Sequence, residues 1–191
     1  ASAQVKSCLL LAGLYAQGET SVTEPAPTRD HTERMLSGFQ YPVKQEENLA
    51  AVRRSGELIA TNIDVPSDIS SAAFFLVGAS IAPNSDLTLK HVGINPTRTG
   101  VIDVLKLMGA NIELSNQRIV GGEPVADIRV RSAALKGIAI PESLVALAID
   151  EFPVLFVAAA CAEGETILTG AKELRVKECD RIQVMADGLK I

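Results

Sequence analysis

The chain has 191 residues, of which 47% are hydrophobic, 21% charged and 4% aromatic, and its formal net charge is −5. This length suffices for one large or two small hydrophobic cores. The acidic balance, with no basic block, argues against a nucleic-acid-binding protein. The longest apolar runs are too short, or too interrupted by charges and proline, to span a bilayer, so we expect no membrane segment.

The three cysteines, Cys8, Cys161 and Cys179, are widely spaced and lack the CxxC spacing or the nearby histidines of a zinc site. Free thiols in a reducing compartment are the expected state, with two of them in a core and one in a loop, so we expect a cytoplasmic protein. The sequence has no initiator Met and stops just after a predicted helix. We interpret it as part of a longer polypeptide.

The first 65 residues predict a helix, a strand, a second helix and two further strands. Ser2 is a typical helix N-cap, and apolar residues from Val5 to Tyr15 recur at helical spacing before Gly18 ends the helix. Asp30 is expected to cap the second helix, with Glu33 as its capping-box partner. The other predicted elements are a helix over residues 31–39 and strands over residues 19–24, 41–46 and 49–54.

The same order restarts at Pro66 and again near Asp150. Thr97 is expected to cap a helix that runs to Met108 and ends at Gly109. The other elements predicted here are helices over residues 69–81 and 150–162 and from residue 180, and strands over residues 86–92, 111–115, 127–131 and 165–168. An internal repeat of this length indicates a duplicated unit that buries its apolar helices by packing on its copies.

The stretch over residues 174–181 has five charged residues out of eight and lies between a predicted strand and a predicted helix. Backbone N–H groups and the positive end of a helix dipole point outward at such a corner. Added cations would make it an anion site, with carboxylates beside it to transfer protons. A solvated loop is the simpler alternative.

Cations recur at the entries of the second helix in each repeat, although the fold needs no charge there. Converging helix N-termini and cations would suit a phosphorylated or carboxylated small molecule. Taken singly, Asp68 and Asp150 could be ordinary caps, His31 a solvated helix residue and Arg98 a structural ion-pair partner. The recurring cations are Arg29, Arg98, Lys177 and Arg181.

Several short motifs, in this order along the whole chain, resemble the family of 5-enolpyruvylshikimate-3-phosphate synthases in its bacterial form. The run Arg-Val-Lys-Glu-x-Asp-Arg is the most specific of them. The motifs are Ser2-Ala-Gln4, Thr28-Arg-Asp-His-Thr32, Asp68-Ile-Ser-Ser-Ala72, Asn95-Pro-Thr-Arg-Thr-Gly100, Asp150-Glu151 and Leu174-Arg-Val-Lys-Glu-Cys-Asp-Arg181.

The resemblance implies a mixed α/β (α+β) fold, the inverse α/β-prism, in which two domains each contain three βαβαββ units. Residues 1–65 would be the last repeat unit of the first domain, incomplete at its start. Residues 66–191 would be the first unit and part of the second unit of the second domain. The partners implied are the remainder of the same polypeptide and two small substrates, without nucleic acid or membrane, in a monomeric parent protein.

The resemblance also implies a reaction of the shikimate pathway, in chorismate and aromatic amino acid biosynthesis. The enolpyruvyl group of phosphoenolpyruvate is transferred to the 5-hydroxyl of shikimate 3-phosphate, phosphate is released, and no metal or organic cofactor takes part. Asp150 would be the base, Glu178 the proton donor, and Lys177 a contact to the same hydroxyl. The substrate-binding positions implied are Ser2, Ala3, Gln4, Arg29, Asp150, Lys177 and Arg181.

Departures from the family pattern limit the resemblance. Ala3 stands where some members have a serine, and Glu173 stands where some have a substrate-binding asparagine, so that role is not transferred. Other family motifs that bind phosphoenolpyruvate lie outside this sequence, so we expect the chain alone to be inactive. The alternatives are the related UDP-N-acetylglucosamine enolpyruvyl transferase and a non-catalytic scaffold of repeats.

Overall fold

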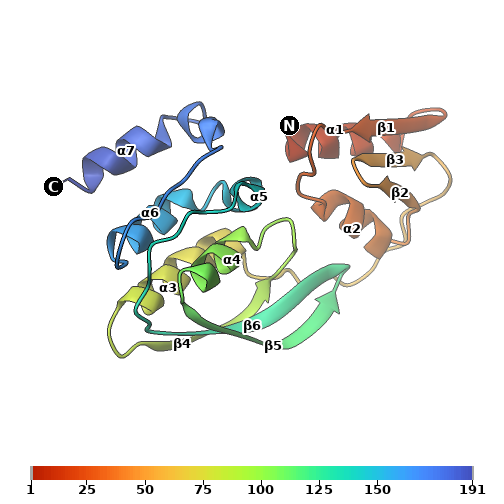
Figure 1. The fold of residues 1–191 in the computed structure, drawn as a ribbon. Coiled ribbons are helices and arrows are strands. Elements are labelled where there is room, and N and C mark those ends of the chain that lie inside the picture. The colour runs from red at the N-terminus through yellow and green to blue at the C-terminus, as the bar shows by residue number, and fades with distance from the viewer. Residues whose placement is uncertain (1, 191) are drawn as a thin grey trace. The chain divides into compact units, whose positions relative to one another are not determined.

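The computed structural model describes residues 2–190 and contains both helices and strands, as the sequence predicts (Figure 1). The chain divides into two compact units. Unit 1 runs up to Val65 and includes Ile119–Pro124, and unit 2 consists of Pro66–Arg118 and the chain from Val125 onward. The assignment of these parts to particular repeats of two domains stays a prediction.

Unit 1 is a three-stranded antiparallel sheet with two helices on one face (Figure 1). The strand order is β1-β3-β2, so the last strand lies in the middle. Its core brings together Leu10, Leu36, Tyr41, Ala50 and Val52. The elements are α1 (Ala3–Gly13), β1 (Glu19–Thr23), α2 (His31–Gly38), β2 (Val43–Glu46) and β3 (Leu49–Arg53).

Helix α1 lies close to this sheet because Gly13 has no side chain. A Cβ atom at Gly13 would lie 2.7 Å from the side chains of both Thr20 and Val52. The helix begins as predicted, since the Ser2 hydroxyl accepts a hydrogen bond from the Val5 backbone N–H at 3.4 Å.

Unit 2 repeats the element order of unit 1 and adds a third, shorter run of helices. Its sheet has the order β4-β6-β5, so again the last strand lies in the middle. Helices α3 and α4 cover one face of the sheet (Figure 1). The elements are α3 (Ile69–Ile81), β4 (Asp86–Gly93), α4 (Gly100–Leu107), β5 (Asn111–Val120), β6 (Glu123–Arg131), α5 (Glu142–Val145), η1 (Ala146–Ala148), α6 (Phe152–Ala160), η2 (Lys172–Arg175) and α7 (Arg181–Gly188).

Isolated parallel β-bridges mark the beginnings of the second and third repeats. Ser67 pairs with Val92, ahead of α3, and Lys136 and Ala139 pair with Glu163 and Ile167 ahead of α6. In each case a helix lies between the two paired segments, which is the βαβ connection. The equal element order and equal strand order confirm the internal repeat.

The structure corrects four details of the predicted elements. The first helix ends at Gly13 and not at Gly18. Helix α4 starts at Gly100, because Thr97 instead donates its hydroxyl to Asn95 Oδ1 at 2.7 Å in a turn. Within residues 165–168 only Ile167 forms an isolated bridge, so there is no full strand. The two strands after α4 are much longer than predicted and form a hairpin whose tip belongs to unit 1.

The predicted burial of two groups of residues is also wrong. All three cysteines are exposed, so none is a core thiol. In α1 the buried residues are Lys6, Leu10 and Gly13, while Val5, Leu9 and Tyr15 of the predicted apolar face are exposed.

Within residues 2–190, no single helix has the length and apolar character needed to cross a membrane. One pair, Glu142–Ala148 with Phe152–Ala160, reaches that length and composition together but is bent by 120°.

Candidate active site

The charged corner of unit 2 connects η2 to α7. Leu174 is fully buried and anchors it, and Asp180 Oδ1 accepts a hydrogen bond from the Gln183 backbone N–H at 3.0 Å, which caps α7. Arg175 pairs with the other oxygen of Asp180 at 2.8 Å. The exposed charges of this corner are therefore held at a capped helix N-terminus, where backbone N–H groups favour anions.

Arg181, the first residue of α7, joins two of the predicted catalytic carboxylates. Its Nη1 donates to Asp150 Oδ1 at 3.1 Å and its Nη2 to Glu178 Oε2 at 2.5 Å. Asp150 lies directly before α6 and Glu178 in the loop before α7, so the fold unites residues 31 positions apart. Three of the predicted site residues of unit 2 thus form one cluster.

The Glu178 carboxylate is ionised more easily than an ordinary glutamate. The hydrogen bond from its own backbone N–H, and then the bond from Arg181, hold its pKa below the usual value. The side chain is 76% exposed. In this state Glu178 is a carboxylate at neutral pH, and it could donate a proton only after desolvation had raised its pKa.

Lys177 is differently engaged. Its ammonium group pairs with Glu173, four residues earlier in the chain, at 2.9 Å. The positive charge nevertheless contributes to the low pKa of Glu178.

A second network, which the sequence did not reveal, lies at the N-termini of α3 and α6. Arg98 pairs with Asp68 at 3.0 Å and donates to the Ser70 hydroxyl at 2.5 Å, and Ser70 in turn donates to the buried carboxylate of Glu151. Burial alone would raise the pKa of Asp68, but the backbone N–H groups of Ser71 and Ser70 and the Arg98 charge lower it. The network ends beside Asp150, and in it Arg98 forms the ion pair that the sequence offered as one of its alternatives.

The predicted site residues of unit 1 surround the start of α1 and the loop before α2. Ser2 is the exposed N-cap, and Ala3 and Gln4 form the first turn, so backbone N–H groups are directed at this end of α1. Arg29 is partly buried in the loop that connects β1 to α2.

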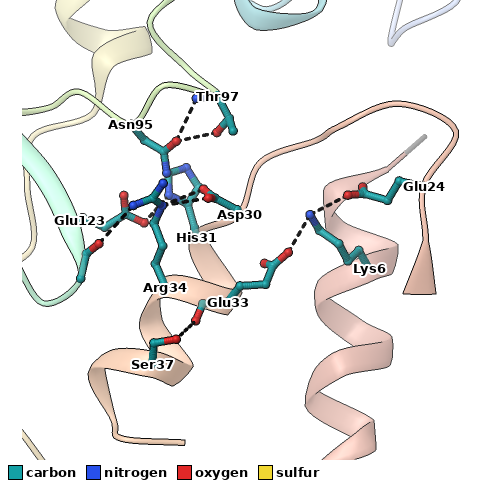
Figure 2. Close-up of polar contacts among 11 residues, drawn as sticks. Lys6, Glu24, Asp30, His31, Glu33, Arg34, Ser37, Asn95, Thr97 and Glu123 are labelled. Atoms are coloured by element: carbon teal, nitrogen blue, oxygen red, sulfur yellow. Dashed lines mark hydrogen bonds and ion pairs between the residues drawn. The ribbon is translucent and has the colours of Figure 1, made fainter. Parts of the chain in front are cut away.

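A buried ion cluster, which no sequence pattern indicated, joins α1 to α2 and to the start of the loop before α2 (Figure 2). Lys6 of α1 pairs with Glu24 at 2.9 Å and with Glu33 of α2 at 2.8 Å. Glu33 therefore does not close a capping box, and Asp30 instead pairs with Arg34 at 2.9 Å. The available signal was Lys6 itself, the single charged residue in the sequence of α1.

Among the residues that the structure describes, no group of three His, Cys, Asp or Glu side chains is placed to hold a metal ion. The candidate site consists of cations, carboxylates and helix N-termini. Such groups can bind anions and transfer protons.

A comparison with known protein families matches residues 1–191, the whole chain, to the model of EPSP synthase (3-phosphoshikimate 1-carboxyvinyltransferase). The chain belongs to the EPSP synthase family. This membership confirms the family indicated by the motifs and agrees with the predicted α/β fold class.

Related proteins support the same family. The chain is 76% identical to a 3-phosphoshikimate 1-carboxyvinyltransferase of Alkalilimnicola ehrlichii and 72% identical to that of Hydrogenovibrio crunogenus, over 99% of its length in each case. A solved structure of EPSP synthase from Acinetobacter baumannii covers 100% of the chain with a TM-score of 0.96 and 69% identity. The chain spans only 42%, 44% and 43% of these three proteins.

Proposed function

We propose that the protein to which this chain belongs transfers the enolpyruvyl group of phosphoenolpyruvate to the 5-hydroxyl of shikimate 3-phosphate, with release of phosphate. The observation that carries the proposal is the Arg181 bridge between Asp150 and Glu178, 3.1 Å and 2.5 Å away. Addition of a hydroxyl to a double bond needs one group that takes the hydroxyl proton and another that protonates carbon, and the two carboxylates would fill these roles once Glu178 is protonated. The high identity to 3-phosphoshikimate 1-carboxyvinyltransferases supports the substrates.

The residues of unit 1 would bind shikimate 3-phosphate. The hydroxyl of Ser2 and the backbone N–H groups at Ala3 would hold the phosphate at the start of α1, with help from Arg29. Gln4, exposed in the first turn, would lie against the ring and reach toward phosphoenolpyruvate. A backbone N–H at Ala3 would replace the hydroxyl that some relatives have there.

The residues of unit 2 would carry out the reaction. Asp150 would take the proton of the attacking 5-hydroxyl as its oxygen bonds to C2 of phosphoenolpyruvate, while Glu178 protonates the methylene carbon. In the second step Glu178, now a carboxylate, would take a proton back from the new methyl group as the bond between C2 and the phosphate oxygen breaks, which restores the double bond and releases phosphate. Arg181 would bind the phosphoenolpyruvate carboxylate and Lys177 the hydroxyl region, so that cations offset the repulsion between two anionic substrates.

The cytoplasmic location, expected from the free thiols, and the monomeric state, implied by the family resemblance, belong to the same proposal. The alternative of a nucleotide-sugar enolpyruvyl transferase has less support, because the matched family model is that of EPSP synthase. A non-catalytic scaffold would show no affinity for shikimate 3-phosphate and no dependence of activity on Asp150 or Glu178.

The proposal is tested by replacing Asp150→Asn in the full-length protein. Phosphate release from shikimate 3-phosphate and phosphoenolpyruvate should show kcat reduced by about 100-fold or more, because general base catalysis typically contributes 10²–10⁴-fold. The matched control is Asp187→Asn, an exposed carboxylate of α7 that contacts Gln183. It should retain the wild-type kcat.

Two results would contradict the proposal. One is an Asp150→Asn variant whose kcat lies within threefold of the wild type. The other is a folded wild-type protein that turns over a UDP-linked sugar with phosphoenolpyruvate but not shikimate 3-phosphate.

A further inference from the structure

The buried ion cluster of unit 1 connects the two segments that would hold the substrate phosphate. We infer that Glu24 is a positioning residue for the shikimate 3-phosphate site, because it links the Thr28–Arg29 loop to helix α1 through Lys6. This inference rests on the function proposed above. It concerns residues that touch no substrate themselves.

Lys6 is the centre of the cluster and is only 3% exposed. Burial lowers its pKa, but the hydrogen bonds and charges of Glu33 and Glu24 outweigh this effect, and the net shift raises the pKa. Lys6 therefore stays a cation while buried. Breaking a buried ion pair is strongly unfavourable, so this cluster holds its elements in one arrangement.

Helix α1 is the first segment tied to the cluster. The backbone N–H of Lys6 donates to the Ser2 carbonyl at 3.1 Å, so Lys6 lies one turn after the N-cap. A second polar contact joins the same part of α1 to α2, since the Thr32 hydroxyl donates to Ser7 Oγ at 2.7 Å. Together they fix the direction of the α1 N-terminus within unit 1.

The loop before α2 is the second segment tied to the cluster. Glu24 holds it through both its backbone and its side chain. The backbone N–H of Glu24 donates to the Asn48 carbonyl at 2.8 Å, and its Oε1 accepts from the Thr28 hydroxyl. The intervening residues 25–27 are exposed, and Arg29 follows Thr28 directly. The Glu24 carboxylate thus closes the loop whose next residue is a proposed phosphate ligand.

Glu33 provides an internal comparison, since it contacts the same ammonium group without holding the loop. It lies 2.8 Å from Lys6, is 2% exposed and belongs to α2. Its second oxygen, Oε2, is buried without a protein hydrogen-bond partner. If the cluster served stability alone, neither carboxylate would have a specific effect on shikimate 3-phosphate binding.

The test is steady-state kinetics of the full-length protein with Thr28→Val and Glu24→Gln. Each change should raise the KM for shikimate 3-phosphate about tenfold or more, because a hydrogen bond to a charged group is lost or weakened. The kcat and the KM for phosphoenolpyruvate should change less than threefold. Thr28→Ser, which keeps the hydroxyl, should restore the wild-type KM.

The double variant Glu24→Gln/Thr28→Val should have a KM no higher than that of the more affected single variant, since both changes break one link. Glu33→Gln should lower the melting temperature while leaving the KM for shikimate 3-phosphate within threefold of the wild type. The exposed Lys44→Met, which disrupts only the surface pair with Glu46, should change neither quantity.

Equal increases in KM for Glu24→Gln and Glu33→Gln would overturn the inference and leave the cluster a purely structural feature. A Thr28→Val variant with the wild-type KM for shikimate 3-phosphate would also overturn the inference. This variant provides the test if Glu24→Gln does not fold. A wild-type protein without turnover of shikimate 3-phosphate would refute the proposed function, and this inference with it. If only the positioning role is wrong, the wild-type protein still turns over shikimate 3-phosphate, so the two failures can be told apart.

Discussion

Arg181 affects both proton-transferring residues of the proposed site. It donates to Asp150 and to Glu178, and it is among the causes that lower the pKa of Glu178. In the reaction, Arg181 would have to exchange part of these contacts for the phosphoenolpyruvate carboxylate. Substrate binding would then both occupy the guanidinium and remove water from Glu178, and desolvation raises a carboxyl pKa.

Replacing Arg181→Gln in the full-length protein should raise the pKa of Glu178 toward the ordinary glutamate value. The reason is that a donor and a positive charge next to the carboxylate are lost. NMR titration of the Glu178 carboxyl carbon measures the change. In the wild type, the ionised form should persist to lower pH, and any stability it contributes should be lost only as pH falls through the lowered pKa.

Arg175→Gln is the control for this titration, since Arg175 pairs with Asp180. It should leave the Glu178 titration nearly unchanged while raising the pKa of Asp180, which Arg175 helps to lower. The explanation would be wrong if Arg181→Gln left the Glu178 pKa at its wild-type value.

At the scale of single elements, the start of α4 is held in place by a close backbone approach. A Cβ atom at Gly100 would lie 2.6 Å from the carbonyl carbon of Leu147 and 2.8 Å from the Ala148 nitrogen. Such contacts involve backbone and cannot be relieved by a side-chain rotation. The helix therefore packs against η1 only because this position is a glycine.

Gly100→Ala should lower the free energy of unfolding by about 1–3 kcal/mol, which is the usual cost of overpacking a core. Chemical denaturation of the full-length protein measures it. Gly56→Ala, in an exposed loop with open space at its Cβ position, should change the value by less than about 0.5 kcal/mol. If the two substitutions changed the free energy of unfolding equally, α4 could shift to accommodate the added methyl group, and the explanation would be wrong.

At the scale of the whole chain, helices that are apolar on more than one side remain partly exposed. Phe74 and Phe75 of α3 are 66% and 58% exposed, and Val5 and Leu9 of α1 are 58% and 44% exposed. Large exposed apolar areas are typical of surfaces that other protein parts cover. Because the chain spans about 43% of its relatives, we expect the rest of the polypeptide to cover these helices.

The 191-residue chain expressed alone should therefore self-associate and show negligible synthase turnover. Light scattering after gel filtration and phosphate release measure the two properties. Adding the preceding and following segments of the full-length protein should reduce the association, restore shikimate 3-phosphate binding in calorimetry and restore turnover. A monomeric chain with turnover near that of the full-length protein would refute this expectation.

Local sequence determined three of the helix starts and the repeat. Ser2, Asp68 and Asp180 each accept a hydrogen bond from a backbone N–H three residues later, which is a contact within one turn and is readable from residue type and spacing. The order of helices and strands followed from periodicity in the same way. The motif over residues 174–181 indicated the family because its residues are contiguous.

Only the tertiary structure decided which distant side chains meet. Asp150 and Arg181, or Lys6 and Glu24, are brought together by the packing of separate elements, and no periodicity within one element encodes such a pair. Lys6 shows the reason most clearly, since a lysine is rarely buried unless it is paired. Its burial depends on two carboxylates, and their positions are set by the fold of β1 and α2 around α1.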